Sequence, residues 1–280
     1  MTQHAEDSVN RRKRKSEPVG DKLNWNLRKG QATEDESLLQ PPPPGTSDFT
    51  HSDTWRVLRI QSEFVEGFDA LATIGPAVTL FGSARTPEDN PMYSAALETA
   101  RLLGETGLSI ITGGGPGIME AANRGARSAG ATSVGMNIEL PFEQHINPYV
   151  DISVEFRYFF VRKTMLIKYS QAFVIFPGGF GTMDELFEAL TLIQTGKIKN
   201  FPVILFGVSY WKGLLDWTRQ TLLAEGNVSE EDLFLLTSTD DPERVRDIIV
   251  EASRGQGTRR AQEARAQANT RRVYAGPGDW

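Results

Sequence analysis

Short apolar runs alternate along the chain with longer segments whose apolar positions repeat at helical spacing. The short runs are apolar throughout, which is typical of strands buried on both faces. This pattern predicts strands at 78–81, 108–111, 133–137, 152–156, 172–176, 203–206 and 233–236. It predicts helices at about 55–71, 92–105, 117–129, 158–169, 182–195, 211–224 and 242–252.

Alternating strands and helices indicate a parallel sheet covered by helices on both sides. We therefore expect one doubly wound, Rossmann-like α/β domain over residues 53–253. Residues 1–52 lack hydrophobic periodicity and contain a basic run at 11–15 and four prolines at 41–44, so a disordered tail is predicted. The Arg-rich residues 254–280 are also expected to be disordered or frayed helix.

Charge and composition narrow the function classes. The net charge is −6, but residues 53–253 hold 16 basic and 26 acidic side chains, which disfavours a general nucleic-acid binder. The basic run at 11–15 is read as a solvated tail, with contact to nucleic acid or an acidic partner left open. The chain has no cysteine and three histidines, so no metal site is expected. With no membrane-length apolar run and no signal-peptide core, a cytoplasmic protein is expected.

Two glycine-rich loops follow predicted strands, at 113–117 and 177–182. Each would present backbone N–H groups and the positive end of a helix dipole, which suits a phosphate. Neither loop has the lysine of a Walker loop, and the dinucleotide fingerprint fails at Ile118. Nicotinamide binding, with Glu139 as the ribose acid, stays an alternative, as does a purely structural role in tight turns.

Acidic and basic residues lie beside the second loop. Asp184 and Glu185 fall in the first turn of the following helix, where a carboxylate could simply cap backbone N–H groups. Two acids next to an anion site are easier to explain if one of them does chemistry. Arg162 and Lys163 lie near the start of the preceding helix, where cations oppose the dipole, and this favours contact with a ligand.

These residues resemble a known family. Residues 177–185 read P-G-G-F-G-T-M-D-E, which is similar to the P-G-G-x-G-T-x-x-E motif of the LONELY GUY family, and Arg162-Lys163 stands 23 residues before Glu185. The segments 113–120 and 81–85 also resemble family segments. The family comprises cytokinin riboside 5′-monophosphate phosphoribohydrolases, long labelled lysine decarboxylases. The resemblance covers about residues 76–250, and residues 139–149 resemble its longer bacterial branch.

The resemblance implies a hydrolase without cofactor that splits adenosine 5′-monophosphate, N6-modified or plain, into free base and ribose 5-phosphate. It implies that Arg162 and Glu185 are catalytic and that the enzyme is a homodimer or homohexamer. The remaining site residues that we expect to bind substrate are Gly82, Ser83, Gly114, Gly115, Gly117, Glu143, Lys163, Gly178, Gly179, Gly181, Thr182 and Asp184.

Several alternatives stay open. Residues 159–161 read Phe-Phe-Val where shorter members carry Met-His before the Arg-Lys pair, so the preferred base is not fixed. A general purine-nucleotide nucleosidase in salvage would use the same bond chemistry. A non-catalytic nucleotide- or molybdenum-cofactor-binding protein would share the fold. A pyridoxal-phosphate decarboxylase is not expected, because Lys163 lacks a recognisable partner for that cofactor.

Overall fold

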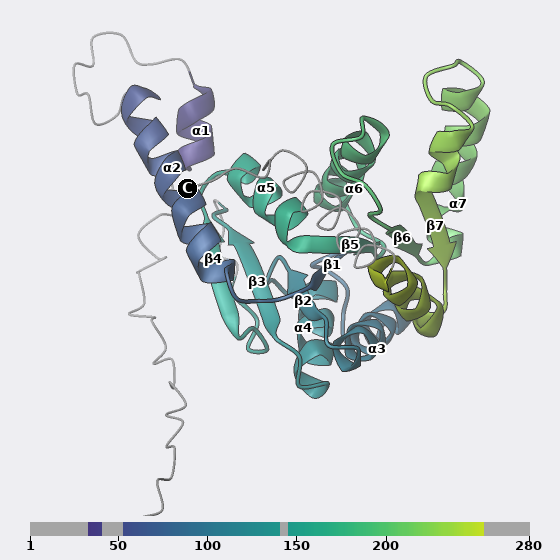
Figure 1. Cartoon of the computed structure of the whole chain (residues 1–280), viewed down its shortest axis with the longest axis horizontal. Coiled ribbons are helices and arrows are strands. Elements are labelled where there is room, and N and C mark those ends of the chain that lie inside the picture. Colours follow the sequence, from purple (N-terminus) through teal and green to yellow (C-terminus); the bar gives the residue numbers. More distant parts are fainter. Residues whose placement is uncertain (1–32, 41–52, 141–144, 255–280) are drawn as a thin grey trace, which may run out of the picture.

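A parallel sheet with the strand order β4-β3-β2-β1-β5-β6-β7 forms the centre of the computed structural model, which describes residues 33–40, 53–140 and 145–254 (Figure 1). All six strand pairs within this part of the chain are parallel. The strands are β1 (Ala77–Phe81), β2 (Ser109–Thr112), β3 (Ser133–Ile138), β4 (Ile152–Phe156), β5 (Ser170–Ile175), β6 (Val203–Phe206) and β7 (Leu236–Thr239). The doubly wound α/β prediction is confirmed.

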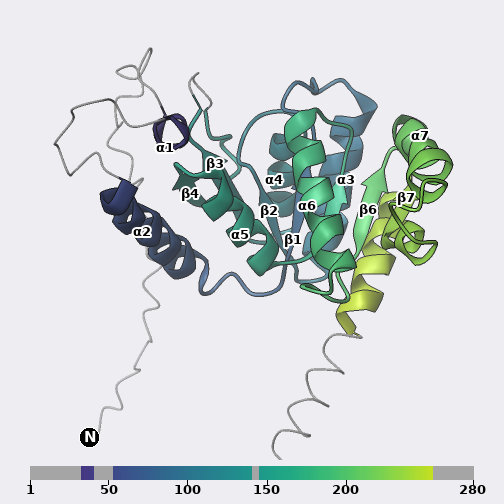
Figure 2. The ribbon, with the colours of Figure 1, turned by 90° about the horizontal axis from the view of Figure 1, so that it is seen from above.

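Helices cover both faces of the sheet, and each face has its own hydrophobic core (Figures 1 and 2). The first core joins the sheet to α2 (Asp53–Leu71), α5 (Phe159–Tyr169), α6 (Phe180–Gln194) and α7 (Val208–Trp217). The second joins it to α3 (Pro91–Glu105), α4 (Ile118–Ser128) and a last helix over 242–254. None of the described helices is long and apolar enough to cross a bilayer.

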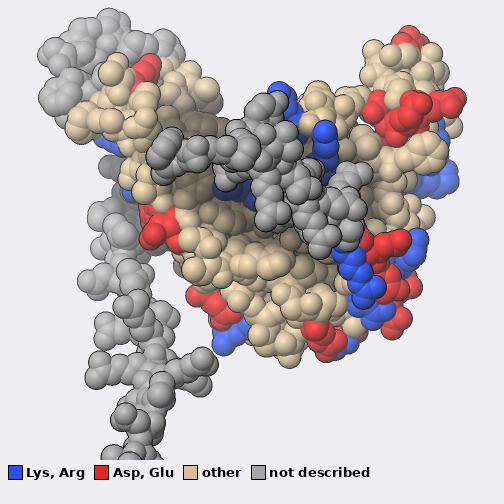
Figure 3. Space-filling view, viewed as in Figure 1, with Lys and Arg blue, Asp and Glu red and all other residues tan. Residues whose placement is uncertain are grey.

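The burial of the strands explains why their sequences are apolar throughout. Every residue of β1, β2, β3 and β6 is buried, as expected for strands covered on both faces. The edge strand β4 alternates between buried and exposed positions at its carboxyl end. Acidic and basic side chains occur side by side along the lower and right-hand edges of the face in Figure 3, so charge there is largely balanced locally.

The predicted strand at 233–236 is wrong. A 3-10 turn occupies Glu231–Leu235, and β7 begins only at Leu236. The turn is fixed by a reciprocal cap, in which the Ser229 N–H donates to Asp232 and the Asp232 N–H donates to the Ser229 hydroxyl. Phe234, which looks like a core residue in the sequence, is 85% exposed.

Helix boundaries near the chain's two ends also differ from the prediction. The helix expected at 211–224 begins at Val208 and ends in a π-helical turn, Thr218–Leu223. A short helix, α1 (Glu34–Leu39), lies inside the range where no structure was predicted, beside α2 and α5. Its acidic first turn accounts for this position, because Glu34 accepts a hydrogen bond from Arg59 of α2 at 2.9 Å. The basic run and the prolines at 41–44 lie outside the described residues.

The sheet reverses its winding between β1 and β5, which are adjacent in space although three strands separate them in sequence. Phe81 pairs with Ile175 at the carboxyl ends of these two strands. Open α/β sheets bind ligands outside the carboxyl ends of their strands at such a switch point. The loops that follow β1 and β5 are therefore expected to form a ligand site.

Candidate active site

A pocket of about 600 Å³ opens at the switch point. Its walls come from the loops after β1, β2 and β5, the end of β3 and the first turns of α5 and α6. The lining residues are Phe81, Gly82, Ser83, Ala84, Arg85, Gly113, Met119, Asn137, Ile138, Leu140, Phe159, Arg162, Gly179, Phe180, Gly181, Thr182 and Glu185.

The loop after β5 leaves the start of α6 open to a ligand. Gly179 is the N-cap of α6, and no side chain caps the helix there. Methyl groups built on Gly179 and Gly181 would meet no atom within 4 Å, so the space above both glycines is free. Uncapped N–H groups, a helix dipole and open space together suit an anion.

Neighbouring side chains fix the shape of this loop. A methyl group on Gly178 would lie 2.1 Å from the Thr182 hydroxyl oxygen, so glycine is needed where Thr182 folds over the loop. The Tyr210 hydroxyl of α7 donates to the Gly178 carbonyl at 2.7 Å. Thr182 itself is buried and lines the pocket.

The loop after β2 mostly supports the wall of the pocket and lines the cavity itself at one glycine. Gly113 lines the cavity, whereas the buried residues Gly114, Gly115 and Gly117 are absent from its lining. Gly117 has φ of +67°, and a methyl group there would meet the Ser83 carbonyl oxygen at 2.4 Å. The Ile118 N–H donates to that same carbonyl, so the first N–H of α4 braces the loop after β1.

A buried polar network holds the loop after β2 in place. The Asn147 amide donates to the carbonyl oxygens of Gly114 and Gly115, both at 3.0 Å. It also donates to Asn123, whose side-chain oxygen accepts from Thr112 at 2.7 Å. Because these groups satisfy one another away from water, the network rigidifies this wall of the site.

Arg162 crosses the floor of the pocket from β3 to α6. Its Nε donates to the Met136 carbonyl at 2.9 Å, and its Nη1 lies 3.7 Å from Glu185 Oε1. The side chain is 12% exposed. Burial lowers the pKa of Arg162, and the opposing charge of Glu185 only partly offsets this.

Glu185 is a buried carboxylate with one uncommitted oxygen. Its side chain is 4% exposed, and Oε2 has no hydrogen-bond partner among the described residues. Burial raises the pKa of Glu185, opposed by the positive charges of Arg162 and Lys163. A carboxylate in this state can accept a proton or face a developing positive charge.

Lys163 ties together the acidic side chains of α6. Its Nζ lies 2.9 Å from Asp184, 2.8 Å from Glu188 and 3.8 Å from Glu185 Oε2. Burial acts to lower the pKa of Lys163, but hydrogen bonds to Glu188 and Asp184 outweigh it, so the net shift is upward. Lys163 therefore stays charged and supports Glu185 from the side away from Arg162.

Two carboxylates from other helices cap the start of α5. Glu63 of α2, which is buried, accepts from the N–H groups of Arg157 and Tyr158. Asp35 of α1 accepts from the Phe159 N–H at 3.0 Å. Because no side chain caps α5 at its own N-cap, Tyr158, these contacts supply the cap and fix the helix that carries Arg162.

Comparison with known proteins gives a consistent picture. A family model described as "Possible lysine decarboxylase" matches residues 119–249. A probable cytokinin riboside 5′-monophosphate phosphoribohydrolase of Oryza sativa subsp. japonica is 29% identical over 167 residues, covering 56% of this chain and 75% of the relative. The cytokinin riboside 5′-monophosphate phosphoribohydrolase of Mycobacterium tuberculosis is 28% identical over 160 residues, covering 56% and 85%. Together these matches support the resemblance to the LONELY GUY family.

A second plant relative and a solved structure also match. A probable phosphoribohydrolase of the same type from Arabidopsis thaliana is 32% identical, over 43% of this chain and 61% of the relative. Among solved structures, the molybdenum cofactor binding protein from Rippkaea orientalis matches with 22% identity and a TM-score of 0.46, covering 63% of this chain and 96% of that one.

The pocket brings together seven of the residues singled out from the sequence: Gly82, Ser83, Arg162, Gly179, Gly181, Thr182 and Glu185. The others that the structure describes lie behind or beside the lining: Gly114, Gly115, Gly117, Lys163, Gly178 and Asp184. Glu143 lies outside the described residues. Their roles in binding substrate stay predictions.

Sequence reasoning missed four residues that shape the site, namely Glu63, Asn137, Asn147 and Tyr210. Asn147 stands in an Asn-Pro turn and Tyr210 near a helix start, but neither position indicates its partner. The amide of Asn137 in a strand expected to be buried was the one available signal, because a polar residue at such a position calls for a specific partner.

Proposed function

We propose that this protein hydrolyses the N-glycosidic bond of adenosine 5′-monophosphate or an N6-modified analogue. The products are the free base and ribose 5-phosphate. The observation that carries the proposal is the uncommitted, buried Oε2 of Glu185 in the pocket, with Arg162 against the other carboxylate oxygen.

The phosphate is placed over the start of α6. The open space above Gly179 and Gly181 and the uncapped first turn form the part of the pocket best suited to an anion. The Thr182 hydroxyl and Ser83 are placed to donate further hydrogen bonds. With the phosphate held there, binding energy orients the sugar toward Glu185, which lies less than one helical turn beyond Thr182.

Glu185 acts at the carbon that carries the base. Cleavage of an N-glycosidic bond passes through an oxocarbenium-like state, as glycoside hydrolysis does. The C1′–N bond breaks, and its electron pair leaves with the base. Water supplies the oxygen that bonds to C1′ and gives one proton to Glu185. Glu185 then releases this proton to solvent, and the departing base nitrogen takes up one proton from solvent, so that in sum one water is added across the bond and the carboxylate is regenerated.

Arg162 has two tasks in this scheme. Its contact with Glu185 opposes the rise in the pKa of that carboxyl group and so favours the ionised form that a base requires. Its guanidinium also lines the cavity, where it can stabilise negative charge on the phosphate or the leaving base. The names of the relatives from Oryza sativa and Mycobacterium tuberculosis support the same bond chemistry.

The test is turnover of defined nucleotides. Purified protein is incubated with adenosine 5′-monophosphate and, separately, with its N6-prenylated analogue, and ribose 5-phosphate and free base are quantified. We expect equal amounts of both products from at least one substrate. Absence of both products with both nucleotides would refute the proposal. The ratio of the two kcat/KM values separates a producer of N6-modified bases from a general salvage nucleosidase.

We also propose that the active form is a homo-oligomer. Large apolar side chains are exposed beside the pocket, including Phe160 at 41%, Phe180 at 95% and Phe187 at 41%. Apolar groups gathered in one place on a surface mark contact sites. Light scattering on the eluting protein should give a mass at least twice that of one chain, and a monomer would contradict this.

A further inference from the structure

Asn137 stands out as a buried polar side chain without a hydrogen bond for its oxygen. It lies near the carboxyl end of β3, is 4% exposed and lines the pocket. Its Oδ1 finds no partner within the described part of the chain. A buried acceptor left unpaired is costly, so such an atom in a pocket wall points to a ligand that completes it.

The position of Asn137 places it at the far end of the pocket from the start of α6. The strands β3 and β5 are separated by β2 and β1, a span of roughly 14 Å at ordinary strand spacing. Arg162 lies between these two sides of the pocket, with Nε on the Met136 carbonyl of β3 and Nη1 toward Glu185 of α6. Glu185 therefore lies between the open glycine loop and Asn137.

This order matches the order of groups in a nucleoside monophosphate. With the phosphate over Gly179 and Gly181 and C1′ beside Glu185, the base extends toward β3. Apart from Arg162, the walls at that end are apolar and are formed by Met119, Ile138, Leu140 and Phe159. An apolar slot with one precisely placed amide suits a flat heterocycle whose orientation is fixed by a few hydrogen bonds.

We propose that Asn137 reads the base, accepting a hydrogen bond from the N–H of a 6-amino group and selecting 6-aminopurines over 6-oxopurines. This inference rests on the proposed function. A carboxamide pairs an acceptor with a donor, and adenine presents the complementary pair at its 6-amino group and N7. A 6-oxopurine presents two acceptors on that edge, so the Asn137 oxygen would be left unpaired against an oxygen.

The chemistry of the 6-amino group gives a sharper distinction. A single N6-alkyl substituent leaves one N–H, so Asn137 accepts both plain and N6-monoalkylated adenines. Two substituents remove the last N–H. The site should therefore discriminate against N6,N6-dimethyl-adenosine monophosphate much more strongly than against the N6-monomethyl compound.

The experiment compares wild-type protein with Asn137→Leu, a change that keeps similar volume but removes the amide. Dissociation constants and kcat/KM are measured for adenosine, inosine, N6-methyl- and N6,N6-dimethyl-adenosine monophosphates. Ribose 5-phosphate binding serves as the internal control, because it lacks the base. We expect wild type to prefer adenosine monophosphate over inosine monophosphate by about 10- to 100-fold. The N6-methyl compound should be preferred over the N6,N6-dimethyl compound by a similar factor of about 10 to 100. In the variant both preferences should shrink to within about threefold, with ribose 5-phosphate binding unchanged.

Specific results would overturn the inference. Unchanged preferences in Asn137→Leu would show that this side chain does not read the base. A parallel loss of ribose 5-phosphate binding would show that it only supports the pocket. If wild type binds these nucleotides without hydrolysing them, the proposed function fails, while the dissociation constants still test Asn137.

Discussion

Arg162 and Glu185 meet in the pocket with Nη1 and Oε1 3.7 Å apart, while Glu185 Oε2 has no hydrogen-bond partner within the described residues. Oε2 can therefore still accept a hydrogen bond from substrate or water. Lys163, 3.8 Å from Oε2, adds a second positive charge to the surroundings of the carboxylate. A purely structural ion pair would leave no such atom unpaired, because buried polar groups are normally satisfied.

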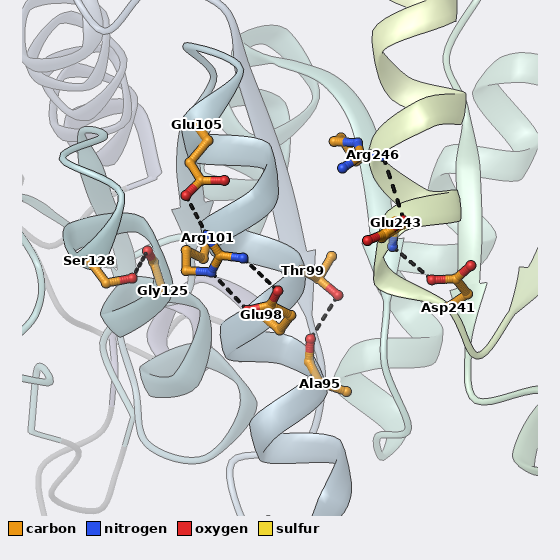
Figure 4. Close-up of polar contacts among 10 residues, drawn as sticks. All are labelled: Ala95, Glu98, Thr99, Arg101, Glu105, Gly125, Ser128, Asp241, Glu243 and Arg246. Carbon is orange, nitrogen blue, oxygen red and sulfur yellow. Dashed lines mark hydrogen bonds and ion pairs between the residues drawn. The ribbon is translucent and has the colours of Figure 1, made fainter.

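Arg162→Lys should lower kcat/KM for the nucleotide by roughly 10²- to 10³-fold. Lysine keeps a positive charge but loses the fork of donors that reaches both Met136 and Glu185. Steady-state release of ribose 5-phosphate measures the effect. Arg101→Lys is the matched control, since Arg101 pairs with Glu98 and Glu105 on α3 (Figure 4) and does not line the pocket. The kcat/KM of that variant should match wild type. An equal loss of kcat/KM in both variants would show that Arg162 has no specific part in the chemistry.

The acid limb of the pH profile should report Glu185. The ionised form is the active base, so log kcat/KM rises with pH, and its midpoint lies above 4.5 because burial raises the pKa of Glu185. Removing a nearby positive charge raises the pKa further. The acid limb of Lys163→Met should therefore move to higher pH. A midpoint at or below 4.5, or a shift to lower pH in this variant, would assign the limb to another group.

Asn147→Ala should destabilise the protein by about 2–3 kcal/mol and raise KM severalfold. The change leaves the carbonyls of Gly114 and Gly115 without their buried donor, so the wall of the pocket loosens. Urea unfolding and substrate titration measure the two effects. Asn90→Ala, which removes the N-cap of α3, should cost about 1 kcal/mol without changing KM. A change in KM for Asn90→Ala as large as that for Asn147→Ala would show that lost stability alone explains the effect.

Two glycines of the second loop should respond in opposite ways to alanine. Gly178→Ala forces Thr182 aside and should cost about 1–3 kcal/mol of stability. Gly181→Ala meets no atom and lies inside α6, where alanine is the better helix former, so the protein should be at least as stable. Its methyl group enters the space assigned to the phosphate, so KM should rise nonetheless. An unchanged KM in a well-folded Gly181→Ala variant would show that the phosphate does not bind above Gly181.

Local patterns predicted most of the fold because burial dictates them. Strands such as β1 and β6 are apolar throughout since helices cover both faces, and this leaves a clear mark in the sequence. The prediction failed at 233–236, where the cap between Ser229 and Asp232 overrode the apolar run. Local hydrogen bonds determined the structure there, and the spacing of apolar residues contains no information about such bonds.

The site was predictable where its residues share a motif and hidden where they meet only in space. Arg162 and Glu185 were found from their spacing and their resemblance to a family motif. Glu63 caps a helix start that lies 94 to 95 positions further along the chain. Asn147 donates to a loop more than thirty positions before it. Such contacts depend on strand order and loop path, which one sequence does not specify.

Glu185→Gln tests the central claim most directly. Glutamine keeps the shape of the side chain but cannot accept the proton of water as a carboxylate does. Release of ribose 5-phosphate from adenosine monophosphate should fall by roughly 10²- to 10⁴-fold, while the dissociation constant changes by no more than about threefold. A folded Glu185→Gln protein that turns over at the wild-type rate would contradict the account.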